Sequence, residues 1–263
     1  MKTEAVRLPA VAGMFYPGDR TELHHMVSGF LHEAKPQGPV PKALVVPHAG
    51  YVYSGPVAAS GYKLLRSARS IIKRVVLLGP SHRVPFTGLA VSSAKYFATP
   101  LGDVPVSQEL MAIAMRFTQV RELDSAHTHE HSVEVHLPFL QETLEKFTAL
   151  PLVVGDASPE EVSEVLDALW GGPETLIVVS SDLSHYHDYE TARRMDEATS
   201  RAIEALKPDD IQYHQACGRV PLNGLLVAAA KRGLHATTID LRNSGDTAGP
   251  RDQVVGYGAY AIA

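Results

Sequence analysis

The chain has 263 residues, of which 45% are hydrophobic and 20% are charged, a composition typical of a folded globular protein. Its net charge of -5, with no basic stretch, argues against nucleic acid as a partner. The single cysteine, Cys217, excludes an internal disulfide framework. No apolar run reaches the roughly 18 residues of a membrane span, and the N-terminal residues lack the apolar core of a signal peptide. We therefore expect no membrane attachment and a cytoplasmic location.

Short apolar runs rich in β-branched residues alternate along the chain with segments of helical periodicity. The predicted strands are 43–46, 74–78, 89–92, 150–154, 176–179, 237–241 and 254–262. The predicted helices are 20–33, 56–68, 108–117, 133–144, 159–170, 189–206 and 222–231. This alternation predicts an α/β fold. We expect residues 1–263 to form a single domain with a mostly parallel central sheet flanked by helices, in which the closing strands add antiparallel edges.

Histidine and aspartate residues follow several of the predicted strands. His48 and His82 follow the first two, Asp182 and His185 follow the fifth, and Asp246 follows the sixth. In open α/β sheets, the loops at the carboxyl ends of the strands converge and form the ligand site. We therefore expect these side chains to meet at one edge of the sheet. The alternative for each of them is a hydrogen-bonded turn residue without a functional role.

Two imidazoles and one carboxylate form a ligand set for a single metal ion. His48, His82 and Asp246 would suit Fe(II) with open positions, and the same set would hold Zn(II) with water or Mn(II). His185 is the best candidate for a general acid or base, because an imidazole titrates near neutral pH. Asp182 could fix the tautomer of His185, or simply begin the loop that His185 caps.

A histidine-rich segment covers residues 127–136. It does not contain the His-Glu-x-x-His pattern of zinc proteases, because Val133 stands where the second histidine is needed. His131 lies at the start of the predicted helix 133–144, and Glu134 follows three residues later on the same face. We therefore expect both side chains to line the substrate pocket. For the remaining histidines, solvated positions at a helix start are an equally good interpretation.

Two tyrosines and the cysteine complete the candidate residues. Tyr51 and Tyr53 follow His48 and are expected to line a pocket that accepts aromatic groups. Cys217 is interpreted as a small packing residue rather than a nucleophile. The chain contains neither the Gly-x-Ser-x-Gly motif of serine hydrolases nor a glycine-rich phosphate-binding motif.

Five motifs in order along the chain resemble the Memo family, whose prokaryotic members are called AmmeMemoRadiSam system protein B. The motifs occupy residues 12–17 (AGMFYP), 47–55 (PHAGYVYSG), 78–82 (LGPSH), 130–138 (EHSVEVHLP) and 180–185 (SSDLSH). The resemblance runs from about residue 8 to the C-terminus.

The resemblance implies a fold similar to class III, LigB-type extradiol dioxygenases, which are non-haem Fe(II) enzymes. His48 and His82 match the family's metal positions, and His185, with Asp182 nearby, matches the acid/base histidine of the dioxygenases. Animal members of the family are proposed to bind iron or copper and phosphorylated receptor peptides. The name of the prokaryotic system implies AMMECR-type and radical SAM proteins as partners.

The chain departs from the family at the third metal ligand, which in animal members is a cysteine in the last loop before the final strand. No cysteine follows Cys217, and the matching stretch offers Asp246 or Thr247 instead. A threonine would be a poor ligand, whereas Asp246 would restore a set of two histidines and one carboxylate. Because copper favours sulfur, we expect iron or another divalent metal rather than copper.

Three hypotheses about function follow. The first is a metal-dependent redox enzyme that acts on a small aromatic or otherwise oxidisable compound. The second is a non-catalytic binding module for a peptide or for the AMMECR-type and radical SAM proteins, with only Arg83, Arg193 and Arg194 to recognise a phosphate. The third is a hydrolase that uses Zn(II)-bound water, because Zn(II) also accepts histidine and carboxylate ligands.

Overall fold

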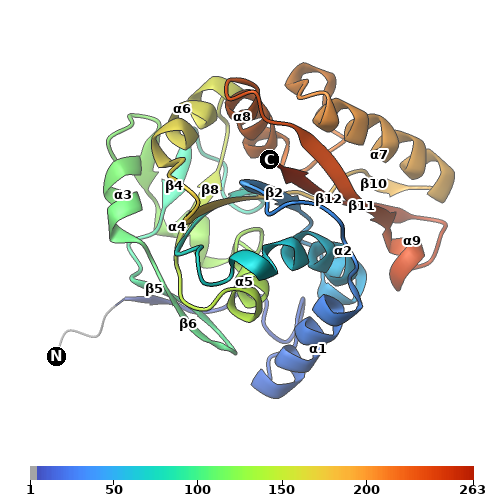
Figure 1. Cartoon of the computed structure of the whole chain (residues 1–263), viewed down its shortest axis with the longest axis horizontal. Helices are drawn as coiled ribbons and strands as arrows, with labels where there is room; N and C mark the ends of the chain where they lie inside the picture. The colour runs from blue at the N-terminus through green and yellow to red at the C-terminus, as the bar shows by residue number, and fades with distance from the viewer. Residues whose placement is uncertain (1–4) are drawn as a thin grey trace.

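The computed structural model describes residues 5–263, and nine of its strands form one central sheet (Figure 1). In spatial order these strands are β10 (His185–His187), β12 (Val254–Ile262), β2 (Ala43–Val46), β9 (Thr175–Ser180), β3 (Arg74–Pro80), β8 (Thr148–Val154), β4 (Leu89–Val91) and β7 (Val120–Glu122), and β11 (Ala236–Asn243) also pairs with β12. A smaller sheet contains β1 (Val6–Arg7), β5 (Tyr96–Thr99) and β6 (Gly102–Pro105). Strands from both ends of the chain therefore join in the central sheet.

The centre of the large sheet is parallel. β2 pairs with β9, β9 with β3, and β3 with β8, all in parallel register, so the carboxyl ends of β2, β9 and β3 lie side by side at one edge. The neighbours on either side, β12 and β4, run antiparallel to β2 and β8. The predicted α/β fold with a parallel centre is confirmed, and its outer strands make the sheet mixed.

Helices cover both faces of this sheet (Figure 1). One face carries α1 (Arg20–Glu33), α2 (Tyr51–Lys63) and α5 (Leu137–Thr143), and the other carries α3 (Gln108–Ala114), α6 (Pro159–Leu169), α7 (Tyr189–Glu204) and α8 (Arg219–Ala230). The remaining helical pieces are α4 (Asp124–Thr128), α9 (Ser244–Thr247) and the 3₁₀ turns η1 (Leu64–Ala68), η2 (Glu134–His136) and η3 (Pro208–Asp210). Within residues 5–263, every helix is too short or too polar to cross a bilayer.

The central strands are mostly apolar because both of their faces are covered, and β2 is apolar at every position. In β2, Leu44 and Val46 belong to the cluster under α1 and α2, whereas Ala43 and Val45 belong to the cluster under α6 and α8. This alternation follows from the two-residue repeat of a strand. On α2, Gly61 allows a close approach to the sheet, because a Cβ atom there would lie 2.8 Å from Val46.

Two predicted helices differ from the observed ones. The helix predicted from Pro56 begins at Tyr51 instead, so Pro56 lies inside it. Proline has no N–H group, so the backbone carbonyl of Val52, four residues earlier, receives no helical hydrogen bond. Val52 is half-exposed. The predicted helix 133–144 is interrupted: the chain forms the 3₁₀ turn η2 and only then α5, with Pro138 in its first turn. Pro138 has no backbone N–H and cannot donate a hydrogen bond to the preceding turn, which favours the change from a 3₁₀ turn to an α-helix at this point.

A buried ion pair joins the N-terminal segment to the histidine-rich segment. The Arg7 guanidinium contacts the Glu134 carboxylate, and neither side chain is more than 5% exposed. Glu134 also accepts hydrogen bonds from the backbone nitrogen atoms of Ala10 (2.7 Å) and Val11 (3.1 Å) and from the Tyr16 hydroxyl (2.5 Å). Glu134 was expected to line a substrate pocket; that expectation was wrong, because its carboxylate is fully used inside the protein.

We predict that Glu134→Gln lowers the free energy of unfolding by about 3 kcal/mol or more, because it leaves the buried Arg7 guanidinium without its anion. Urea unfolding of the purified protein measures this change. Glu109→Gln is the matched control, since Glu109 is 68% exposed and its ion pair with Arg74 lies on the surface. That variant should differ from the parent by about 1 kcal/mol at most. Equal losses in both variants would contradict the role given to Glu134.

Candidate metal centre

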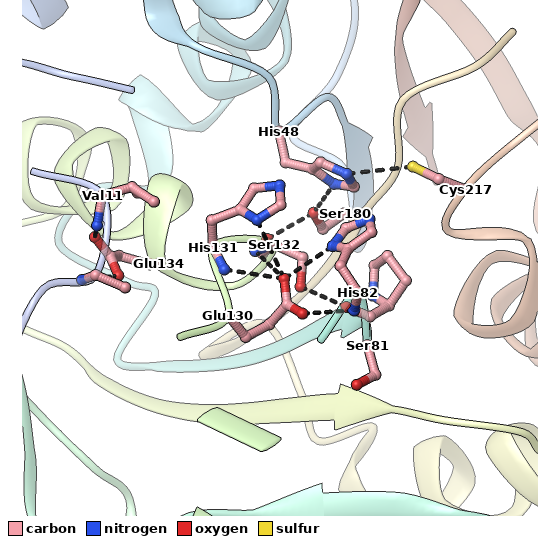
Figure 2. A network of polar contacts seen from close by, with 12 residues as sticks. Val11, His48, Ser81, His82, Glu130, His131, Ser132, Glu134, Ser180 and Cys217 are labelled. Carbon is pink, nitrogen blue, oxygen red and sulfur yellow. Dashed lines mark hydrogen bonds and ion pairs between the residues drawn. The ribbon is translucent and has the colours of Figure 1, made fainter. Parts of the chain in front are cut away.

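Three histidines from distant parts of the chain meet at the carboxyl edge of the central strands (Figure 2). His48 follows β2, His82 follows β3, and His131 lies just before η2. One ring nitrogen atom from each lies within 4.8 Å of the other two. The ring centroids are 5.1 Å apart for His48 and His82, 5.4 Å for His48 and His131, and 4.7 Å for His82 and His131. The three imidazoles are therefore close enough to bind one ion.

The hydrogen bonds of His48 determine which nitrogen atom faces the centre. Its Nδ1 lies 2.6 Å from the Ser180 hydroxyl, and that hydroxyl donates its own hydrogen to the Ser132 carbonyl at 2.6 Å. Ser180 therefore accepts a hydrogen bond from Nδ1–H, which leaves the lone pair on Nε2. In metal sites, a hydrogen bond from the ring nitrogen that does not bind the ion orients the histidine in this way.

A buried carboxylate orients His82 in the same way. Glu130 Oε1 lies 2.9 Å from His82 Nδ1, and Oε2 accepts a hydrogen bond from the His82 backbone nitrogen at 2.6 Å. Burial alone would raise the pKa of Glu130, but the hydrogen bonds from His82 and from the Ser132 backbone lower that pKa to about 2. Glu130 is thus an anion that only accepts hydrogen bonds, so His82 Nδ1 donates to it and Nε2 is the ring nitrogen left to bind an ion.

His131 contributes an uncharged imidazole, whose Nδ1 lies 3.4 Å from Glu130 Oε1. Burial, with repulsion from His82, lowers the pKa of His131 to about 4. Its Nδ1 is buried and forms no hydrogen bond with any described residue, and its ring packs against Phe15 with centroids 4.8 Å apart. Burial likewise holds the pKa of His48 well below its usual value, with further lowering by the neighbouring histidines. Both rings are neutral at pH 7, which is the form that binds a metal ion.

These residues fit a transition-metal ion. One nitrogen atom from each of the three imidazoles lies within 4.8 Å of the other two, and the rings of His48 and His131 are neutral at pH 7. Three histidines match the ligand set of a zinc site with an open fourth position, and imidazole also suits iron, copper and nickel. Mn(II), which prefers oxygen ligands, is less well matched than the sequence suggested.

The structure does not bring Asp246 into this cluster, and the expected ligand set is corrected accordingly. Its carboxylate accepts hydrogen bonds from the Asn243 backbone nitrogen at 3.0 Å and from the Tyr189 hydroxyl at 2.6 Å, as part of the cap of α9. The physical reason is the position of β12, which lies between β11 and β2. Two strand spacings, about 10 Å, therefore separate the end of β11 from the end of β2. His131, expected in the pocket wall, supplies the third imidazole.

Cys217 and Asp182 lie beside His48. Cys217 Sγ is 3.2 Å from His48 Nε2, so this cysteine, which was expected only to pack, also contacts a candidate metal ligand. Asp182 Oδ1 accepts a hydrogen bond from the His48 backbone at 2.7 Å, and Oδ2 lies 4.0 Å from His48 Nε2. Burial raises the pKa of Asp182 to about 7. Gly218 permits this arrangement, because a Cβ atom there would lie 2.3 Å from the Ser180 carbonyl.

His185 occupies the edge strand β10, close enough to His48 to contribute to the lowering of the His48 pKa. Burial lowers the pKa of His185, and the His82 ring lowers it further. The next residue, Tyr186, has a left-handed backbone conformation with φ of 59°, and the register of β10 against β12 shifts between His185 and His187. Such irregularities can redirect a side chain next to a functional site.

The two tyrosines expected in the pocket have different positions. Tyr51 is buried in α2, and its hydroxyl donates to the Val135 carbonyl at 2.5 Å, so it supports the histidine-rich segment instead of contacting a ligand. Tyr53 is 40% exposed and contributes, with Asp182 and Tyr186, to the electrostatic environment of Tyr257. Tyr53 is thus the one of the pair that remains available to a ligand.

His136 is a buried imidazole that the sequence did not single out. It is fully buried beside Tyr62, with ring centroids 6.2 Å apart, and neither of its nitrogen atoms has a hydrogen-bond partner within residues 5–263. Burial, with repulsion from His131, lowers the pKa of His136 to about 3. The ring is therefore held neutral next to the metal centre.

A family model described as Memo-like protein matches residues 7–261. The chain belongs to the Memo family. It is 38% identical to a "MEMO1 family protein" of Aquifex aeolicus over 96% of this chain and 97% of the relative, and 32% identical to one of Sulfolobus acidocaldarius over 96% and 97%. The crystal structure of the uncharacterized protein JW3007 from Escherichia coli K12 has a similar fold, with a TM-score of 0.53, 13% identity, and coverage of 82% of this chain and 98% of that one.

We predict that His48→Ala, His82→Ala and His131→Ala each abolish stoichiometric metal binding by this Memo family member, whereas Asp246→Asn retains it. Mass spectrometry of the metal content and calorimetric titration of the metal-free protein with Zn(II) measure the effect. His25→Ala, on the exposed surface of α1, is the control. Retention of the ion in His131→Ala together with its loss in Asp246→Asn would restore the ligand set expected from the sequence.

We predict that His136→Leu makes the free energy of unfolding less sensitive to acid. The unfolded state gains a proton near pH 6.5, whereas folded His136 gains it only near pH 3, so stability falls as the pH drops. Removing the imidazole should eliminate about 3 kcal/mol of this loss between roughly pH 6.5 and pH 4.5. Urea unfolding over this pH range measures it, and His32→Leu at an exposed position should keep the parent slope.

Proposed function

We propose that this Memo family member binds one divalent transition-metal ion through His48, His82 and His131 and acts as a metal-dependent enzyme on a small molecule. One observation supports the proposal above all others: the imidazoles of three histidines from distant parts of the chain, two of them oriented by Ser180 and Glu130, bring one nitrogen atom each within 4.8 Å of the other two.

The residues around the three histidines suit proton transfer. His185 is a partly exposed imidazole close to the centre, and we assign it the role of taking up or giving a proton to a bound substrate. Asp182 holds the His48 backbone and keeps a second carboxylate oxygen 4.0 Å from His48 Nε2. When bound, the metal ion would supply Lewis-acid or redox chemistry.

We propose Fe(II) as the ion and an oxidisable, aromatic small molecule as the substrate. The support is the resemblance of the motifs to a family whose fold is similar to non-haem Fe(II) dioxygenases. A Zn(II) hydrolase is the second candidate, because the candidate ligands are three histidines without a carboxylate, which is also a ligand set of catalytic zinc. The exposed Arg193 is already paired with Glu190 and Glu197, which gives no support to a phosphopeptide module.

The experiment is a comparison of metal content and activity in protein purified without oxygen. Iron at one ion per chain, with oxygen uptake on addition of catechols, is the result expected from the first candidate. Chelator-sensitive ester hydrolysis without oxygen uptake would support the second candidate instead. Protein that contains no metal and takes up neither Fe(II) nor Zn(II) would overturn the proposal.

We predict that His185→Gln lowers the turnover number by about 100-fold or more, because a general acid or base contributes roughly that factor. Metal content should remain at the parent level, since His185 is not among the three ligands. The pH profile of the turnover number should also lose the limb that reports this imidazole. His25→Gln is the control for a histidine remote from the centre. An unchanged pH profile in His185→Gln would remove this residue from the mechanism.

A further inference from the structure

A cavity of about 540 Å³ lies beside the metal centre, between the loop 80–87 and the first residues of α8. Two of its lining residues belong to the surroundings of the histidines. Ser81 immediately precedes His82, and Cys217 Sγ is 3.2 Å from His48 Nε2 (Figure 2). A molecule in this cavity therefore lies directly beside the proposed reaction site.

Arg219, a half-buried residue, gives this cavity a positive charge that no carboxylate among residues 5–263 neutralises. Its Nε is buried without a hydrogen-bond partner, and the guanidinium forms no ion pair with any residue from 5 to 263. The guanidinium carbon lies 6.0 Å from the centroid of the Tyr213 ring, which also lines the cavity. A buried donor on a cation without an acceptor is unfavourable, so an acceptor supplied by a ligand would stabilise it.

The surroundings of Arg219 favour an anion. Arg219 is the first residue of the 12-residue helix α8, and no side chain caps that end, so the positive end of the helix dipole adds to the guanidinium charge. Asp156 also lines the cavity, but it is exposed and does not pair with Arg219. Val84 and Phe86 contribute an apolar wall. A planar guanidinium fork is suited to carboxylate and phosphate oxygens.

We infer that the cavity binds a small anionic molecule, a carboxylate or a phosphate monoester with an apolar body, whose anionic group pairs with Arg219. The apolar body would extend along Val84 and Phe86 toward Cys217 and the histidines. The inference rests on the proposed function, because the anionic molecule would be the substrate of the same metal centre. The binding of the anion itself requires only Arg219 and the cavity.

Calorimetric titration of the full chain with benzoate, phenyl phosphate and benzamide tests the inference, with the protein metal-loaded and metal-free. Benzoate or phenyl phosphate should bind to both forms, and the tighter of the two identifies the anion. Arg219→Gln should weaken that binding by about 10- to 100-fold, and Arg219→Lys by less. Arg121→Gln, on the exposed surface of β7, is the matched control and should bind like the parent.

Three outcomes separate this inference from the proposed function. Equal binding of the anion by the parent and Arg219→Gln, with the metal content of both unchanged, would overturn the anion site alone. Benzamide that binds as tightly as benzoate would also overturn it, because the charge would then play no part. Arg219-dependent binding in a protein that takes up no metal would support the anion site and refute the metal-dependent enzyme.

Discussion

The candidate centre depends on one buried carboxylate, that of Glu130. Its two oxygen atoms accept hydrogen bonds from the backbone and ring of His82 and from the backbone nitrogen atoms of His131 and Ser132. These bonds join the loop after β3 to the segment before η2. They hold two of the three imidazoles against a single carboxylate. The anion also determines the tautomer of His82, so one group provides both position and chemistry.

Close approach of backbone segments completes this arrangement. Gly79, in β3, leaves room for Ser132, since a Cβ atom there would lie 2.6 Å from the Ser132 hydroxyl oxygen. That hydroxyl donates to the Pro80 carbonyl at 2.8 Å, and the Ser132 carbonyl receives the bond from Ser180. The ends of β3 and β9 are thereby tied to the same residue. The parallel strands bring His48 and His82 to one edge, and this serine network holds His131 against them.

Electrostatics distinguish the centre from the rest of the molecule. Burial keeps His48, His131 and His136 neutral, so the centre contains few positive charges of its own despite its many imidazoles. Two residues that line the neighbouring cavity differ in this respect: Arg219 carries a positive charge without an ion-pair partner among residues 5–263, whereas Cys217 contacts the neutral ring of His48. The cavity therefore combines a positive charge with a wall next to an uncharged imidazole. This asymmetry can orient an anionic molecule.

The sequence by itself determined the α/β fold, the parallel centre and two of the three histidines. Apolar runs in the sequence show where the strands lie. Residues that directly follow parallel strands lie at the carboxyl edge of the sheet, and His48 and His82 are placed there by this rule alone. The third ligand position could not be decided in this way. Asp246 also follows a strand, but β12 lies between β11 and β2, and strand order is a property of the whole sheet. His131 and Cys217 follow no central strand; only tertiary contacts, through Glu130 and the close approach at Gly218, bring them to His48 and His82.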